Sequence, residues 1–192
     1  MRSSLLWLSM IAGLLGVNTL GYAGSANARF DFTATFVGGT CDISAPRSVS
    51  FNGGNALLAA DIEQHDGSTT ETFTLTLSGC DGWGMTPSIK VSGQTTTDFS
   101  DDPLFLNPPS VSEANGYGLL LSTAGNSTFE SNENLAKSPT ILAKNWSTST
   151  ELKPNLDTSL PMTAQLSCGS CSFPGRHGGA FSATVTFEFV YE

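Results

Sequence analysis

The chain has few residues whose types and spacing could do chemistry, and the most suggestive of them are Cys168 and Cys171. They form a CxxC pattern, which is typical of a redox pair, of half a zinc site or of a small structural disulfide. A redox pair needs a helix start in a βαβ context, and zinc needs two further ligands. These cysteines have strand-like flanks and no second CxxC. We therefore expect Cys168 and Cys171 to form a structural disulfide that pins a turn.

The other two cysteines are Cys41 and Cys80, so that the chain has four cysteines in all. Four cysteines allow three pairings in principle. A Cys41–Cys80 bridge would close a loop of about 40 residues, which would stabilise the folded chain by roughly 3–4 kcal/mol in the chain-entropy model.

No group of residues assembles into a catalytic, metal or cofactor site. A nucleophile needs a base such as histidine beside it, and the two histidines, His65 and His177, lie in polar turn sequences. The acidic residues between Asp61 and Asp102 match no calcium-loop spacing. No Gly-rich phosphate loop follows a strand and opens a helix. The sequence therefore predicts a protein that is not an enzyme and has no cofactor.

Length, composition and charge favour one globular domain with protein partners. The chain has 192 residues, of which 39% are hydrophobic and 13% charged. That suits a single packed core rather than a disordered acidic chain. Eight Lys and Arg against 17 Asp and Glu argue against a nucleic-acid partner, because basic side chains supply most affinity for phosphates.

The first 28 residues have the pattern of a cleaved signal peptide. Arg2 precedes an apolar run from Leu5 to Leu20, and Ala26-Asn27-Ala28 offers a small-x-small cleavage site. Ala23 is a second possible cleavage point. We expect residues 29–192 to form the mature, exported single domain, for which an oxidising compartment favours disulfides.

The rest of the chain reads as short strands. Apolar and polar residues alternate with a period of two, and Gly, Pro, Asn and Ser separate the runs. The alternating or apolar runs are 29–37, 71–79, 88–93, 116–123, 139–144, 162–168 and 179–192. The stretch 95–115 reads as a loop with an edge strand, and 56–62 as a short helical turn. This pattern predicts an all-β sandwich of immunoglobulin-like type.

The two ends of the predicted domain and its first cysteines carry a resemblance to a known family. A glycine stands 14 residues from the C-terminus, and alternating apolar residues and a penultimate aromatic follow it. Those places are held by Gly179, Val185, Phe187, Phe189 and Tyr191. The sequence TCDI at Cys41 and LSGC at Cys80 match the family's first disulfide. With these features the sequence resembles the pilin subunits of chaperone–usher fimbriae across the mature chain.

The resemblance implies an incomplete immunoglobulin-like sandwich that lacks its final strand. A donor strand from a periplasmic chaperone or from a neighbouring pilin subunit would complete the sandwich. It implies that residues 179–192 form the strand that the chaperone contacts. It also implies that residues 29–37 are the donor strand, with Phe30, Phe32, Ala34 and Phe36 facing the partner's groove. The family usually has glycine where Ala34 stands.

The expected function is that of a structural subunit of a bacterial surface fimbria that supports adhesion. An outer-membrane usher would be a further partner, and the route would lead through the periplasm to the cell surface. The alternative is a single-domain adhesive or tip-adaptor subunit that binds a host glycan or protein receptor through its loops. Under that alternative, an exposed Trp83 or Trp146 could stack on a sugar, whereas a tryptophan in the core or lining the groove would not.

Overall fold

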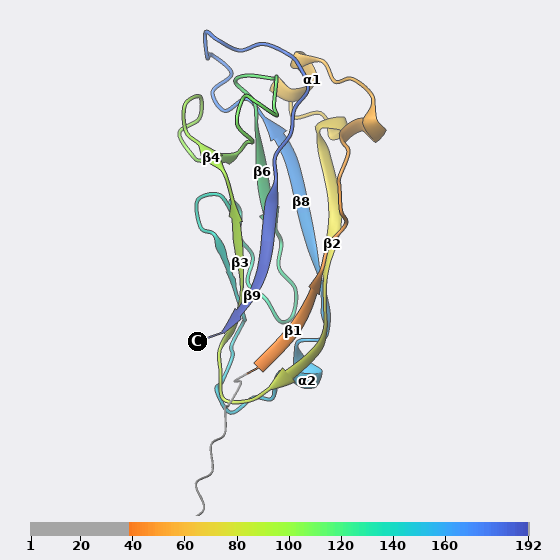
Figure 1. Cartoon of the computed structure of the whole chain (residues 1–192), viewed down its shortest axis with the longest axis vertical. Coiled ribbons are helices and arrows are strands. Elements are labelled where there is room, and N and C mark those ends of the chain that lie inside the picture. The colour runs from red at the N-terminus through yellow and green to blue at the C-terminus, as the bar shows by residue number, and fades with distance from the viewer. Residues whose placement is uncertain (1–38, 192) are drawn as a thin grey trace, which may run out of the picture. The chain divides into compact units, whose positions relative to one another are not determined.

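The computed structural model describes residues 39–191, whose regular secondary structure is mostly β-strand (Figure 1). Residues 1–38 and 192 lie outside the described part, so the predicted leader and the predicted donor strand 29–37 fall outside it. Every pair of strands is antiparallel. No helix among the described residues is long and apolar enough to cross a membrane.

Six strands form the larger sheet, in the order β1-β2-β8-β6-β5-β4. Their bounds are β1 Gly39–Ser44, β2 Thr70–Gly82, β8 Thr158–Ser167, β6 Gly118–Thr123, β5 Leu104–Phe105 and β4 Thr95–Thr96. Strand β1 is therefore one edge of this sheet. The period-two alternation in β2 and β8 turns one face of each strand inward, as the sequence predicts.

Three strands form the smaller sheet, in the order β7-β3-β9. Their bounds are β7 Thr140–Leu142, β3 Pro87–Gly93 and β9 Val185–Tyr191. Strand β9 is an edge strand, since it pairs only with β3 among the described residues. The helical elements are short: η1 Phe51–Gly54, α1 Ala59–Glu63, η2 Gly67–Thr69 and α2 Leu152–Asn155.

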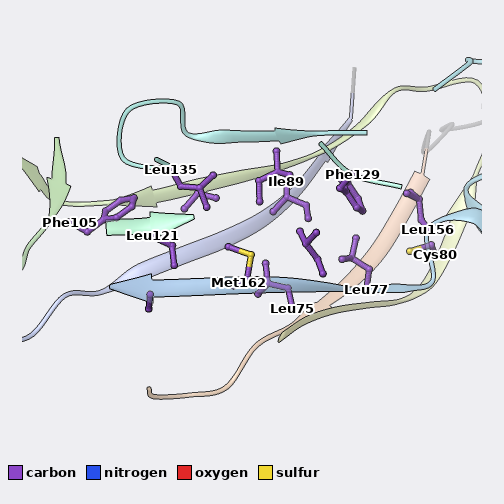
Figure 2. Packing of buried hydrophobic residues seen from close by; sticks show 14 of the residues in the cluster. Leu75, Leu77, Cys80, Ile89, Phe105, Leu121, Phe129, Leu135, Leu156 and Met162 are labelled. Carbon is purple, nitrogen blue, oxygen red and sulfur yellow. The ribbon is translucent and has the colours of Figure 1, made fainter. Parts of the chain in front are cut away.

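The main core fills the space between the two sheets (Figure 2). Strand β3 contributes Ile89, and strands β2 and β8 contribute Leu75, Leu77 and Met162, all fully buried. A side chain of leucine or isoleucine size stabilises the fold by roughly 1.5–3 kcal/mol when it is fully buried.

Asparagine side chains organise the irregular connection between β6 and β7. Asn126 Oδ1 accepts the backbone N–H groups of Thr128 and Phe129, each at 2.7 Å. Asn134 Oδ1 accepts the N–H of Ala136 at 2.9 Å. Such side-chain caps satisfy backbone donors without a strand ladder. The connection can therefore place the fully buried ring of Phe129 in the core.

A disulfide joins Cys41 in β1 to Cys80 in β2, next to a bulge in their pairing. Gly79 has a φ of 60°, a left-handed conformation that glycine adopts readily. The backbone N–H of Cys80 donates to Asp157 Oδ1 at 3.0 Å. This end of β2 is thus tied both to the edge strand β1 and to the segment that leads into β8.

The last strand is shorter than its alternating sequence suggests. The alternation starts near Gly179, but the regular strand begins only at Val185. Before it, the N–H groups of Asn107 and Ala114 donate to the carbonyl groups of Ser182 and Ala180, each at 3.0 Å. The backbone of 180–184 is thus held by irregular bonds to the loop 107–114. The loop predicted at 95–115 also contains the two short strands β4 and β5.

Candidate functional site

The inner face of β9 lacks the cover that the neighbouring strand has. In the ladder, Phe187 pairs with Val91 and Phe189 pairs with Ile89. Val91 and Ile89 are 1% and 0% exposed, whereas both phenylalanines are only half-buried, although they pack against the same core. Side chains on β9 are therefore less buried than their partners on the adjacent strand β3. This is expected where a sheet ends before its core is covered.

The opposing edge belongs to β1 and to the chain that follows it. Ile43 in β1 is half-buried, while its partner Leu77 in β2 is fully buried. Strands β1 and β9 lie near each other in different sheets, and no hydrogen-bonded ladder joins them. The sandwich is open between the chain that follows β1 and the first part of β9 with the residues before it.

A pocket of about 370 Å³ occupies the first part of this opening. One wall is the segment Ala45–Val49, and the other runs along 181–187. Its apolar floor comes from the larger sheet, through Phe73, Leu119, Leu121 and Ala164. The rings of Phe73 and Phe187 meet at 62° with centroids 6.3 Å apart, which joins the floor to β9.

A second pocket, of about 500 Å³, continues the opening toward α1. The two pockets share Val49, Phe51 and Phe181, so together they form one groove, called here the open groove. The further lining of the second pocket includes Ala56, Leu57, Ile62, Ala114, Tyr117, Leu166, Gly178 and Gly179. Arg47 is the only charged residue among the described residues that line the two pockets. The open groove therefore suits an uncharged, apolar occupant.

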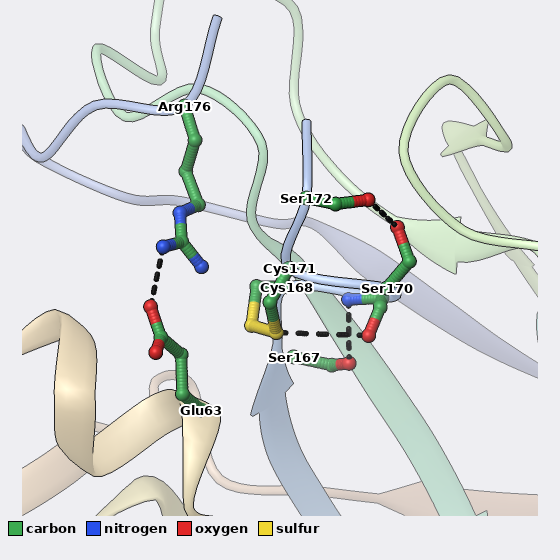
Figure 3. Close-up of a disulfide and its surroundings, with 8 residues drawn as sticks. Glu63, Ser167, Cys168, Ser170, Cys171, Ser172 and Arg176 are labelled. Atoms are coloured by element: carbon green, nitrogen blue, oxygen red, sulfur yellow. Dashed lines mark hydrogen bonds and ion pairs between the residues drawn. A yellow bond between two sulfur atoms is a disulfide. The ribbon is translucent and has the colours of Figure 1, made fainter. Parts of the chain in front are cut away.

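The second disulfide, Cys168–Cys171, shapes the chain that forms the far wall of the open groove (Figure 3). It closes a tight turn at the end of β8, in which Gly169 and Cys171 have φ angles of 58° and 57°. The Gly169 N–H donates to Ser167 Oγ at 3.1 Å. Cys168 itself is fully buried, in a small core that also contains Ile62.

Arg176 connects this turn to α1. Its guanidinium forms an ion pair with Glu63, just after the buried residue of α1, as Figure 3 shows. It also lies over the ring of Tyr117, 5.8 Å from the centroid, at cation–π distance. These two contacts hold α1 and the chain after the disulfide on the two sides of the second pocket.

The predicted site residues lie as follows. Phe30, Phe32, Ala34 and Phe36 are outside the described residues. The structure pairs Cys41 with Cys80 and Cys168 with Cys171. Gly179, Val185 and Phe187 line the open groove, and Phe189 and Tyr191 continue β9 beyond it.

The other candidates from the sequence do not converge on one place. His65 and His177 are exposed. Among residues 39–191, no three His, Cys, Asp or Glu side chains form a group that could hold a metal ion. Trp83 is exposed, and Trp146 is half-buried with its Nε1–H donating to the Met85 carbonyl at 2.7 Å.

Sequence reasoning missed the wall opposite β9. Val49, Phe51 and Leu57 line the groove from a segment that has no regular alternation. The available signal was three large apolar residues in a stretch otherwise rich in Gly, Asn and Ser. Large apolar side chains in such a stretch are a signal that another part of the chain, or a partner, contacts some of them.

Comparison with known proteins adds the following findings. A family model described as fimbrial protein matches residues 30–192. A solved structure of a chaperone–usher pilus, reported for the uncoiling of its rod, is 20% identical over 88% of this chain and 97% of that chain, with a TM-score of 0.51. The P pilus rod subunit PapA is 22% identical over 85% of this chain and 100% of that one, with a TM-score of 0.47. A comparison with curated proteins found no match.

The likeness to the pilus structure confirms the predicted fold class. The chain is an all-β, immunoglobulin-like sandwich without its final strand, and the open groove lies along β9, which has no outer neighbour within residues 39–191.

Proposed function

Because the chain belongs to the fimbrial protein family, whose members are structural and not enzymatic, we propose that it is a structural subunit assembled by donor-strand exchange through the chaperone–usher route. The family implies a surface pilus in which subunits contact one another. Donor-strand exchange would be the way in which the subunits contact one another: each subunit inserts its segment 29–37 into the open groove of a neighbour.

The open groove is the observation that carries this proposal. It combines an apolar floor, a half-buried row of side chains on β9 and an edge of β9 that is unpaired among the described residues. An incoming strand could bond to that edge with its main chain and place alternate side chains on the floor, which is a complete mode of peptide recognition.

The segment 29–37 has the composition that such a groove demands. Phe30, Phe32, Ala34 and Phe36 alternate with Arg29, Asp31, Thr33 and Thr35. A strand places these two sets on opposite faces. The apolar set would face the groove, where Arg47 is the only charged lining residue, and the polar set would face water.

The same groove explains why a chaperone is needed before assembly. An unfilled groove exposes apolar surface and unpaired backbone groups, and both promote aggregation. In our proposal a periplasmic chaperone fills the groove and holds the strand within 179–192. An outer-membrane usher then exchanges the chaperone for the next subunit, and the fimbria emerges at the cell surface.

The test is polymerisation of the full chain co-expressed with its cognate chaperone. Deleting residues 29–37 should leave the amount of soluble chaperone-bound subunit unchanged and abolish fibres seen by electron microscopy. Phe32→Asp should do the same, because it places a charge on the apolar floor. Thr33→Asp, on the opposite face of the strand, is the matched control and should polymerise normally. Fibres formed by the deletion variant would refute the proposal.

The alternative function, an adhesive or tip-adaptor subunit, rests on one observation, the exposed ring of Trp83. If it holds, the purified subunit should bind particular sugars on a glycan array, and Trp83→Ala should remove that binding. Binding no greater than that of buffer would count against it.

A further inference from the structure

Five large apolar side chains are exposed among the described residues, namely Val49, Leu58, Trp83, Val111 and Leu142. The two most exposed, Leu58 and Trp83, lie at opposite ends of the sandwich. Trp83 is 65% exposed and directly follows β2. Leu58 is 68% exposed and directly precedes α1. Strand β2 runs between these two ends and, with 13 residues, is about 40 Å long. Figure 1 shows α1 at one end and α2 with the start of β1 at the other. One exposed apolar residue at each end of a molecule would allow a contact that repeats from copy to copy.

The ring of Trp83 is held in place although it is exposed. Its Nε1–H donates to the Ser149 carbonyl at 3.1 Å, and its backbone forms a bridge with Glu151. The only polar atom of the ring is therefore satisfied within the chain. The remaining exposed surface of the side chain is apolar, which suits packing against another apolar group.

Trp83 lies beside the point where the proposed donor strand leaves the domain. Gly39, the first residue of β1, pairs with Gly82, the neighbour of Trp83. Phe36 is the last donor residue that we expect in a partner's groove, and only two residues separate it from Gly39. A chain this short keeps the Cα atom of Trp83 within about 20 Å of the position of Phe36 in the partner.

Leu58 lies at the rim of the groove at the other end. Its neighbours Leu57 and Ala59 line the pocket of about 500 Å³, and Leu58 itself points away from that pocket's lining into solvent. This pocket is the end of the open groove that is nearest to α1. There, Ile62 of α1 packs with Leu166, which lies close to the end of β8.

The direction of the donor strand decides which end of the partner Trp83 meets. Strand β9 runs away from the α1 end, because residues 178–181, which precede it, line the same pocket as Ile62 of α1, and its arrow points to the other end of the sandwich (Figure 1). An antiparallel donor, like every strand pair in the described domain, would finish with Phe36 at the α1 end. A parallel donor would instead finish at the opposite end of the partner, where the partner's own donor strand leaves its domain. Three copies of the chain would then have to occupy the same space. An open fibre therefore requires the antiparallel arrangement.

We propose that Trp83 of one copy packs against Leu58 of the next copy, in a head-to-tail contact that accompanies strand exchange. The inference rests on the proposed function, since the donor strand brings the two ends together. The contact is heterologous: each copy presents Trp83 at one end and Leu58 at the other, so the fibre can extend without closing.

Tryptophan fluorescence tests this contact directly. The chain has three tryptophans, Trp7 in the expected leader, Trp83 and Trp146, so Trp146→Phe leaves Trp83 as the only reporter in the mature chain. The exposed reference is a self-complemented subunit, in which a copy of residues 29–37 follows Glu192 through a flexible linker and the original segment is deleted. In fibres of the full chain, acrylamide should quench Trp83 several-fold less than in the reference, and its emission should shift to the blue.

Variants of the partner residue identify what covers the ring. In the Trp146→Phe background, Leu58→Ser should raise the quenching of Trp83 in fibres toward the reference value. The matched control is Leu142→Ser, since Leu142 is 55% exposed but lies on β7, an edge strand of the smaller sheet, and not beside α1. That control should leave the quenching unchanged.

The outcomes separate this inference from the function on which it rests. Fibres that form while Trp83 stays as accessible as in the reference would overturn the contact and leave strand exchange standing. Shielding that Leu58→Ser does not relieve would overturn Leu58 as the partner. A chain that forms no fibres would overturn both, and shielding of the monomer by a sugar would favour the adhesive alternative instead.

Discussion

Gly179 forms part of the groove wall at a point where another loop passes close to it. A Cβ atom on this residue would lie 2.9 Å from the carbonyl carbon of Glu113 and 3.0 Å from the backbone nitrogen of Ala114. Backbone atoms cannot rotate out of the way as side chains do. Gly178, one position earlier, has no atom within 4 Å of its Cβ position. The two adjacent glycines therefore form a matched pair for mutation.

Gly179→Ala should lower the free energy of unfolding of the self-complemented subunit by about 1–3 kcal/mol, because the wall must shift to admit the methyl group. Gly178→Ala should change it by less than about 1 kcal/mol, and in the stabilising direction if its conformation suits alanine. Urea unfolding followed by circular dichroism measures both. Equal midpoints for the two variants would contradict the argument from close approach.

The two disulfides act on different elements. Cys41–Cys80 joins the edge strand β1 to β2 across a sequence separation of 39, and Cys168–Cys171 closes a turn across a separation of only 3. In the chain-entropy model, the stabilisation grows with the length of the loop that is closed. The first bond should therefore restrict the unfolded chain more, and the second should act mainly on the local shape of the groove wall.

Replacing both Cys41 and Cys80 by alanine should reduce the free energy of unfolding by about 4 kcal/mol, and replacing both Cys168 and Cys171 by about 2 kcal/mol. Denaturant unfolding of the two double variants of the self-complemented subunit measures this order. A reversed order would show that the turn after β8 contributes more to folding than its short loop implies.

At the scale of the whole molecule, stability is tied to assembly. The described domain leaves the inner face of β9 half-covered, so its folded state is incomplete without an added strand. Whatever binds the folded subunit and not the unfolded chain stabilises it. Subunit stability and fibre formation should therefore depend on the same strand.

The self-complemented subunit should be soluble and monomeric without a chaperone and should bind little of a dye that reports exposed apolar surface. The full chain released from its chaperone should polymerise or aggregate. Size-exclusion chromatography and dye fluorescence measure the difference. The control carries Phe32→Asp in the appended copy and should behave like a subunit with an empty groove. A control as soluble as the parent would show that the appended strand does not fill the groove.

Much of the fold could be predicted because its signals are local. The alternation in 71–79 and 162–168 predicts strands that appear within β2 and β8, since a period of two sorts side chains onto two faces of any strand. Family membership was likewise predictable, from a resemblance in the sequences around Cys41 and Cys80 and in the alternation that ends at Tyr191, and the family model that matches residues 30–192 confirms it.

The groove could be predicted only as an implication of the family resemblance. The pattern of β9 is the same whether the strand is central or at an edge, because alternation records which face is apolar and not how many neighbours the strand has. The late start of β9 at Val185 also has a non-local cause, in the bonds of the preceding residues to the loop 107–114.

The sequence by itself determined most strands and the class of sandwich, since a period of two is a property of neighbouring residues, and its resemblance to pilin subunits indicated the family. Only the tertiary structure decided that β9 is a half-covered edge, that Val49 and Phe51 face it across a groove, and that Trp83 and Leu58 stand exposed at opposite ends. The extent to which these residues are buried or exposed arises from contacts between segments far apart in the chain, whereas the local alternation records only which face of a strand is apolar.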